Sequence, residues 1–333
     1  MFARHTCMTL LFRTSSTHAL SIISVLILCT ALLTACNSAP APQAAKSTPT
    51  IQAPSPTKSI PTPTAIPPTP THAATPERYT ARTLLQGVGR PDDLAFDKSG
   101  RLLFSDAHNG TISRLNADGS VTVLVSGIAA PEGIVVLPNG TMIIAEQGPN
   151  RILALAPGAS SPRVLRQLPG SPSTASCKDG VDGLAFDAKT NSIIVPDSPI
   201  GTVYSMSLDG KTLTLLASGI TRPVGAAVDA AGNIYIADEC GGALWYLSPS
   251  GKLTRIGGFG MLDDVVIDAN GNILVTDLQP QIHALIRYNP TTGARTTLAS
   301  RGYIEPQGLE IDQRGNIFVS DDYANIIVEY SPA

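Results

Sequence analysis

The chain has 333 residues, enough for one large domain or two small ones. Its formal net charge of −3 is unevenly spread, because the part from Tyr79 onward carries 18 Lys and Arg against 25 Asp and Glu, a net of −7. An acidic domain repels phosphate backbones, so these counts argue against a nucleic-acid partner.

Residues 1–36 have the pattern of a lipoprotein signal peptide. Two arginines, Arg4 and Arg13, precede the apolar run Ser21–Thr34, which is too short to span a bilayer comfortably. The run leads into Leu-Thr-Ala-Cys, which resembles the bacterial lipobox and would make Cys36 the lipidated first residue of the mature protein. We therefore expect an exported protein, anchored to the bacterial membrane through Cys36 and facing away from the cytoplasm. The alternative is an ordinary signal peptide with a chance cysteine.

Residues 37–78 are of low complexity, with 11 Pro among many Thr and Ser and with no aromatic residue. Such a segment cannot bury a core and is expected to stay disordered and extended. Pro-rich chain advances about 3.1 Å per residue, so this tether is long enough to hold a domain up to roughly 100 Å from a membrane.

From Tyr79 to the end the chain repeats, and such repeats take priority over local patterns. The acids that end the repeats are spaced by 40, 51, 41, 39 and 44 residues, which is the period of a four-stranded propeller blade. The repeated segments are Arg90–Asp106, Ala130–Glu146, Gly180–Asp197, Arg222–Asp238, Met261–Asp277 and Glu305–Asp321.

Each repeat contains a short apolar run, such as Ile273–Thr276, that is bounded by turn residues and typical of a strand buried on both faces. A third and a fourth strand follow in every repeat except the sixth, which stops after its third. The segment Tyr79–Val88 is similar to the fourth strands, so we expect it to complete the last blade and remove an exposed sheet edge. The sequence therefore predicts an all-β, monomeric, six-bladed β-propeller over residues 79–333.

The repeated pattern P-[DE]-G-[LIV]-x-x-D-x-x-G-N-[IL]-[YFL]-[VI]-x-D resembles that of the NHL-repeat and SMP-30/gluconolactonase group of six-bladed propellers. The resemblance covers Tyr79–Ala333 and implies the fold. It does not imply one activity, because these propellers include lactonases, lyases and binding modules.

The first strand of each propeller blade lines the central channel, so residues at its start should converge at one mouth. An oxygen-rich ring without Cys or His suits Ca²⁺ or Mg²⁺ over zinc, and we expect Ca²⁺. The alternative is a ring that is merely solvated. The candidate ligands are Asp92, Glu132, Asp182, Asp263 and Gln307, while the fourth repeat has Val224 in this position.

The resemblance implies a metal held from four blades, which here correspond to Asp92, Asp182, Val224 and Asp263. Valine cannot bind a metal, and Glu132 lies on a blade that the family does not use. The match to the family's metal ligands is therefore partial. It argues against lactonase activity more than it argues against metal binding.

Two further sets of acids are predicted to be structural. The acids that end the repeats, from Asp106 to Asp321, should accept backbone N–H groups in nearby loops. Asp268 and its equivalents should form hairpin turns together with glycines of positive φ. Asp268 does not begin an EF-hand, because Gly271 is fourth and Gln279 twelfth in the count from it.

Few groups near the predicted mouth could transfer a proton. His108 and His283 lie on loops and are the candidates for a general base, and the alternative is that each is a surface residue. Three other residues are predicted to line the rim of the mouth and to contact a ligand. These are Gln147, Lys178 and Tyr323.

The one long insertion, Leu168–Val181, precedes the third blade and should overhang the mouth. It contains Cys177, and Cys240 lies in a loop of the neighbouring blade, so a disulfide between them is one of two outcomes that we consider, the other being two free thiols.

Two functions fit these residues. One is a surface-tethered module that binds a small molecule, protein or carbohydrate at the mouth, with or without a metal. The other is a Ca²⁺-dependent lactonase or esterase, in which the metal polarises a carbonyl and His108 or a carboxylate activates water. The incomplete ligand set favours the binding module.

Overall fold

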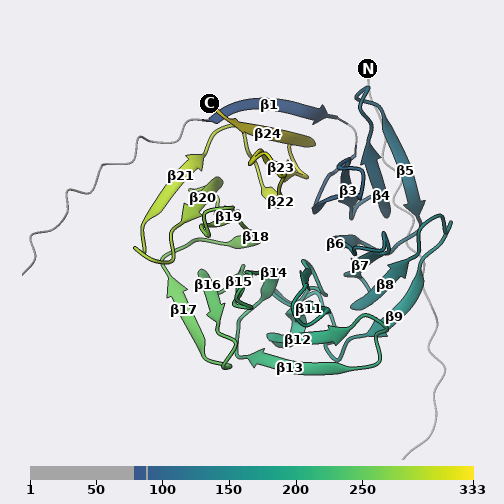
Figure 1. Cartoon of the computed structure of the whole chain (residues 1–333), viewed down its shortest axis with the longest axis vertical. Helices are drawn as coiled ribbons and strands as arrows, with labels where there is room; N and C mark the ends of the chain where they lie inside the picture. Colours follow the sequence, from purple (N-terminus) through teal and green to yellow (C-terminus); the bar gives the residue numbers. More distant parts are fainter. Residues whose placement is uncertain (1–78, 88) are drawn as a thin grey trace, which may run out of the picture. The chain divides into compact units, whose positions relative to one another are not determined.

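The structure is a computed structural model that describes residues 79–87 and 89–333. It consists of six four-stranded antiparallel sheets arranged around a central axis (Figure 1). The predicted all-β, six-bladed propeller is thereby confirmed. The signal peptide, Cys36 and the tether lie outside the described residues. Within the described part, no helix is long and apolar enough to cross a membrane.

The first three blades use the strands between residues 94 and 218. Blade 1 comprises β2 (Leu94–Phe96), β3 (Leu102–Asp106), β4 (Thr111–Leu115) and β5 (Val121–Ser126). Blade 2 comprises β6 (Pro131–Val136), β7 (Met142–Glu146), β8 (Arg151–Leu155) and β9 (Arg163–Gln167). Blade 3 comprises β10 (Ala185–Asp187), β11 (Ser192–Asp197), β12 (Thr202–Ser207) and β13 (Leu213–Ser218), with the 3₁₀ helix η1 (Ser198–Ile200) after β11.

The last three blades continue the same order. Blade 4 comprises β14 (Pro223–Val228), β15 (Ile234–Asp238), β16 (Ala243–Leu247) and β17 (Leu253–Gly257). Blade 5 comprises β18 (Leu262–Ile267), β19 (Ile273–Asp277), β20 (Ala284–Tyr288) and β21 (Arg295–Ala299). Blade 6 comprises β22 (Pro306–Ile311), β23 (Ile317–Asp321), β24 (Ile326–Pro332) and β1 (Tyr79–Gln86).

The N-terminal strand β1 pairs antiparallel with β24, from Tyr79 opposite Pro332 to Gln86 opposite Ile326. Its Leu85 is buried in the core between blades 6 and 1, against residues such as Ile327. Closure of the ring by this strand stays a prediction. Val88, the last residue of the predicted strand, lies outside the described residues.

Burial is greatest in the second strand of each blade and least in the outermost strand. The second strands β15, β19 and β23 are buried at every position, as expected of apolar runs that pack between neighbouring blades. The outer strands are mostly exposed or half-buried, and in β13 only Ala217 is buried while Leu215 is 55% exposed. The core is therefore a set of layers between adjacent blades.

The predicted roles of the two structural sets of acids are confirmed. Asp277 accepts the backbone N–H groups of Gly260 and Met261 at 2.8 and 3.0 Å, which fixes the connection from blade 4 to blade 5. Asp268 accepts the N–H groups of Asn270 and Asn272 within a hairpin turn. The end of the channel near Asp277 is called the loop face below, and the end near Asp268 the hairpin face.

Near the axis the blades touch through their backbones. The N–H of Gly133 in blade 2 donates to the carbonyl of Asp182 in blade 3, at 3.1 Å. A Cβ atom added at Gly133 would lie 2.5 Å from that carbonyl oxygen, so this position requires glycine. The channel walls are thus held together just below the loop face.

Two blades carry an aspartate where the others carry this glycine. Asp93 in blade 1 accepts the N–H of Ile134 in blade 2 at 2.6 Å, and Asp264 in blade 5 accepts the N–H of Leu309 in blade 6 at 2.8 Å. A carboxylate thus replaces the direct backbone contact between neighbouring blades.

Candidate metal centre at the loop face

Three of the five predicted ligands come together at the loop face. Asp92 precedes β2, Glu132 lies in β6 and Asp182 precedes β10, and each offers a carboxylate oxygen within 4.8 Å of the other two. Oxygens on one Ca²⁺ ion lie about 2.3–2.6 Å from it, so two of them are at most about 5 Å apart. The three side chains therefore fit a hard divalent cation, and their all-oxygen donor set argues against zinc.

The acids of this cluster resist ionisation without a cation. Burial, followed by the charges of the other acids, raises the pKa of Glu132 and of Asp263 well above their usual range. Burial also raises the pKa of Asp92 to about 7, although a hydrogen bond from Glu132 lowers it in part. Asp263 is also buried, and its charge contributes to the raised pKa of Glu132. It is not one of the three residues whose carboxylate oxygens lie within 4.8 Å of one another. A bound dication would offset this concentration of negative charge.

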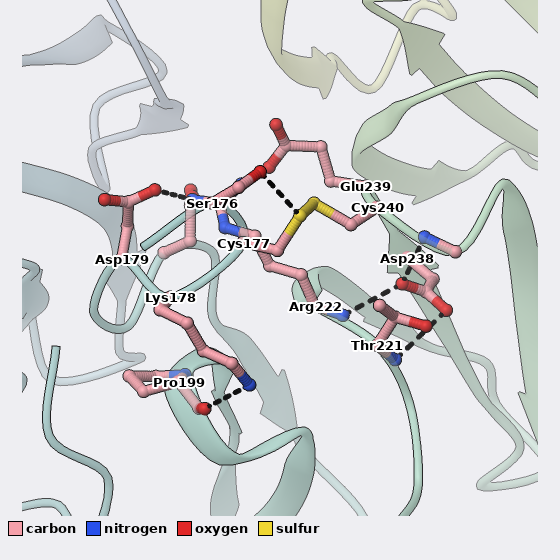
Figure 2. Close-up of a disulfide and its surroundings, with 12 residues drawn as sticks. Ser176, Cys177, Lys178, Asp179, Pro199, Thr221, Arg222, Asp238, Glu239 and Cys240 are labelled. Carbon is pink, nitrogen blue, oxygen red and sulfur yellow. Dashed lines mark hydrogen bonds and ion pairs between the residues drawn. A yellow bond between two sulfur atoms is a disulfide. The ribbon is translucent and has the colours of Figure 1, made fainter. Parts of the chain in front are cut away.

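Arg222 is the residue at this site that sequence reasoning missed. Its side chain is 7% exposed and lies 3.0 Å from Asp182 and 3.8 Å from Asp179. It is also ion-paired with Glu239, and Figure 2 labels Arg222, Asp179 and Glu239. Burial raises the pKa of Asp182, and the charge of Arg222 opposes that rise. The sequence does carry a signal for Arg222. This arginine precedes a proline in the fourth repeat, which is the one repeat with an apolar residue, Val224, at the position of the predicted metal ligands.

The insertion before blade 3 is held at two points. In the structure a disulfide joins Cys177 to Cys240, in the loop after β15 (Figure 2). The Nζ of Lys178 donates to the carbonyl of Pro199 at 2.8 Å, so its ammonium group is bound within the loop face. The disulfide lies next to Glu239, which places the insertion beside the ion pairs of Arg222 (Figure 2).

Gln307 belongs to a second polar group on the loop face. Its amide Nε2 donates to Asp322 at 3.3 Å, and Asp322 is ion-paired with Arg90 at 2.8 Å. The Arg90 guanidinium lies 4.5 Å from the centre of the Tyr323 ring, which is 54% exposed. Tyr323 is therefore available on the rim.

The predicted proton-transfer residues lie apart from the three carboxylates. His108 is exposed on the loop after β3, and His283 is half-buried with a positive φ of 38°. Burial raises the pKa of Glu305, and the nearby His283 opposes that rise. Gln147 is half-buried on the rim, and a Cβ added at Gly180 would lie 1.9 Å from its carbonyl oxygen, so backbone packing fixes its position.

No protein-family model matches the chain, whereas solved structures match its fold. A gluconolactonase from Xanthomonas campestris is 18% identical with a TM-score of 0.64, covering 79% of this chain and 94% of its own. A streptogramin B lyase is 12% identical with a TM-score of 0.59, covering 77% of this chain and 98% of its own. A chain of the nidogen/laminin complex is 18% identical with a TM-score of 0.59, covering 69% and 88%. These propellers are gluconolactonase-like and NHL-like, and at such identities the similarity shows the fold alone.

Proposed function

We propose that this protein is a membrane-tethered binding module whose loop face holds Ca²⁺ between Asp92, Glu132 and Asp182. The observation that carries the proposal is the approach of their carboxylate oxygens to within 4.8 Å of one another. Calcium takes six to eight oxygen ligands, so three carboxylates leave positions open for a ligand. An oxygen-rich molecule such as a carbohydrate has the donors to fill them.

The surroundings of the cluster support binding over catalysis. Arg222 compensates part of the charge of Asp182 but is itself shared with two further acids. His108, one of the two candidate bases, is exposed and has no part in the cluster. The predicted signal peptide and Pro-rich tether also suit a domain that is presented at a distance from a membrane.

Calcium titration by isothermal calorimetry, on the chain purified with chelator, tests the metal. We expect a Kd in the range of about 10⁻⁴–10⁻³ M at pH 8, which is typical of extracellular modules. Glu132→Gln should weaken binding at least about tenfold, because it removes one anionic ligand. Asp209→Asn serves as the matched control, since this exposed hairpin acid lies outside the cluster.

The affinity should also fall as the pH is lowered from 8 to 6. The pKa of Asp92 is raised to about 7 and that of Glu132 lies well above its usual range, so protons compete with the metal in this interval. Each displaced proton contributes up to about tenfold per pH unit. Calcium binding that is absent, independent of pH or unchanged in Glu132→Gln would contradict the metal centre.

Ligand binding has its own test, a carbohydrate array probed with calcium or with chelator. We expect binding signals on the array that disappear with chelator and in the Glu132→Gln variant. Signals that persist under both conditions would place binding elsewhere.

Hydrolysis of a lactone or ester is the second candidate, and the carboxylate cluster at one end of the channel is the observation that favours it. A panel of lactones and aryl esters, assayed with calcium and with chelator, distinguishes the two. Turnover that requires both calcium and Asp182 would replace the binding module by the enzyme.

A further inference from the structure

A cavity of about 1210 Å³ opens at the hairpin face, away from the carboxylate cluster. The innermost strands of five blades line it, namely β2, β6, β10, β18 and β22. Half-buried apolar side chains on its walls include Phe96, Phe186, Val266 and Ile311. The cavity has room for an organic molecule, and its lining combines these apolar side chains with charged ones.

Glu310, on the wall of this cavity, departs from the repeat. Its carboxylate accepts one hydrogen bond, from the N–H of Ile311 at 2.8 Å, and among the described residues no basic side chain is ion-paired with it. Burial raises its pKa to about 7. The equivalent residues of the other blades are all small or apolar: Ala95, Val135, Ala185, Ala227 and Val266. An acid at an apolar position is costly unless a partner compensates it.

Two more acids, Asp93 and Asp264, add negative charge to the lining of the cavity. Their carboxylates each accept two backbone N–H groups, so their role in joining the blades is already satisfied. These acids and Glu310 do not form a metal-sized group, since the one such group found in the described part of the chain is at the loop face. We therefore consider an organic cation for this cavity.

We propose that the hairpin-face cavity binds an organic cation with an apolar body, with its ammonium group beside Glu310. The apolar part would lie against Phe96 and Phe186, whose ring faces also attract a cation. The rim includes basic side chains, but Arg82 and Arg101 are ion-paired with Glu329 and Asp97. The remaining two, Lys98 and Arg314, are exposed, where solvent and salt screen them.

Three probes of similar shape and different charge test this inference on the full chain. They are 4-phenylbutylammonium, the neutral 4-phenylbutanol and the anionic 4-phenylbutanoate, each titrated by calorimetry at pH 7.5. We expect saturable binding of the ammonium, at least about tenfold weaker binding of the alcohol and no binding of the carboxylate. Equal affinity for the ammonium and the alcohol, or no saturable binding of any probe, would overturn the proposal.

Glu310→Gln assigns the effect to one residue. The amide keeps the shape and an oxygen for the N–H of Ile311, so thermal unfolding should show an intact fold. Affinity for 4-phenylbutylammonium should fall about tenfold, since a charged hydrogen-bond partner is lost. Unchanged affinity in a folded Glu310→Gln variant would also overturn the proposal.

Two comparisons separate this cavity from the metal centre. Glu132→Gln should leave 4-phenylbutylammonium binding unchanged, and Glu310→Gln should leave calcium binding unchanged. A loss of ammonium binding in Glu132→Gln would place the cation at the loop face and overturn the second site. Failure of calcium binding alone would contradict the proposed function and not this inference.

Discussion

At the scale of single residues, Arg222 compensates the negative charge of the buried acids at the loop face. It is nearly fully buried and contacts Asp182, which is also nearly buried, at 3.0 Å. Removing one partner of a buried ion pair leaves an uncompensated charge, which costs more than the pair itself contributes. The same positive charge, however, disfavours a metal ion next to Asp182.

The substitution Arg222→Met should therefore change two properties in opposite directions. Without calcium, the free energy of unfolding should fall by about 3 kcal/mol, because Asp182 and Glu239 lose their partner. Calcium affinity should rise by about tenfold, because a neighbouring like charge is removed. Urea unfolding with chelator and calcium calorimetry measure the two effects.

Arg90→Met is the matched control for Arg222→Met. Arg90 holds the equivalent repeat position, but its side chain is 32% exposed and its ion pair with Asp322 lies outside the carboxylate cluster. This variant should lose about 1 kcal/mol or less and keep its calcium affinity. If Arg222→Met weakened calcium binding, Arg222 would be organising the cluster and our electrostatic account would be wrong.

At the scale of elements, the insertion before blade 3 is a long segment with little regular structure of its own. Its anchors are the disulfide to blade 4 and the bond from Lys178 to the carbonyl of Pro199. Its backbone also turns sharply at Cys177, which has a φ of 63°. The disulfide spans 63 residues and therefore constrains the unfolded chain across blade 3 and into blade 4.

Reduction of this disulfide should destabilise the fold by about 4 kcal/mol, the chain-entropy value for a loop of this length. Urea unfolding with and without reductant measures the loss, and mass spectrometry of a non-reduced digest identifies the linked peptides. The double variant Cys177→Ser with Cys240→Ser should be as unstable as the reduced protein and insensitive to reductant. Two free thiols in the untreated protein would show that the bond does not form.

At the scale of the whole molecule, the pairing of β1 with β24 joins the two ends of the propeller sequence. If the ring is closed in this way, no blade is incomplete and blade 6 depends on strands from both ends of residues 79–333. Leu85 carries the packing part of this contact, since it is 5% exposed in the core between blades 6 and 1.

If β1 closes the ring, Leu85→Ala should cost about 3 kcal/mol, as expected for a leucine removed from a packed core. Leu215→Ala in the outer strand β13 is the matched control, because this leucine is 55% exposed and should cost no more than about 0.5 kcal/mol. Urea unfolding measures the free energy of unfolding of both variants and of the unchanged protein. Equal, small losses in both variants would show that β1 does not contribute to the stability of the folded propeller.

The sequence by itself determined the number of blades, the strands and the turns. These features depend on local chemistry that recurs with each repeat, such as the acid of the hairpin at Asp268 and the buried run from Ile273 to Thr276. It also placed Asp92, Glu132 and Asp182 at one end of the channel, because equivalent positions of a propeller meet at its axis.

Only the tertiary structure decided what neighbouring blades do to one another. Arg222 contacts an acid 40 residues away, and Asp93 binds a backbone N–H 41 residues away, each about one repeat period along the chain. The strand pattern gives this period but not which side chains cross between blades. The cavity beside Glu310 likewise exists only where five innermost strands surround a common axis, because no single blade contains its walls.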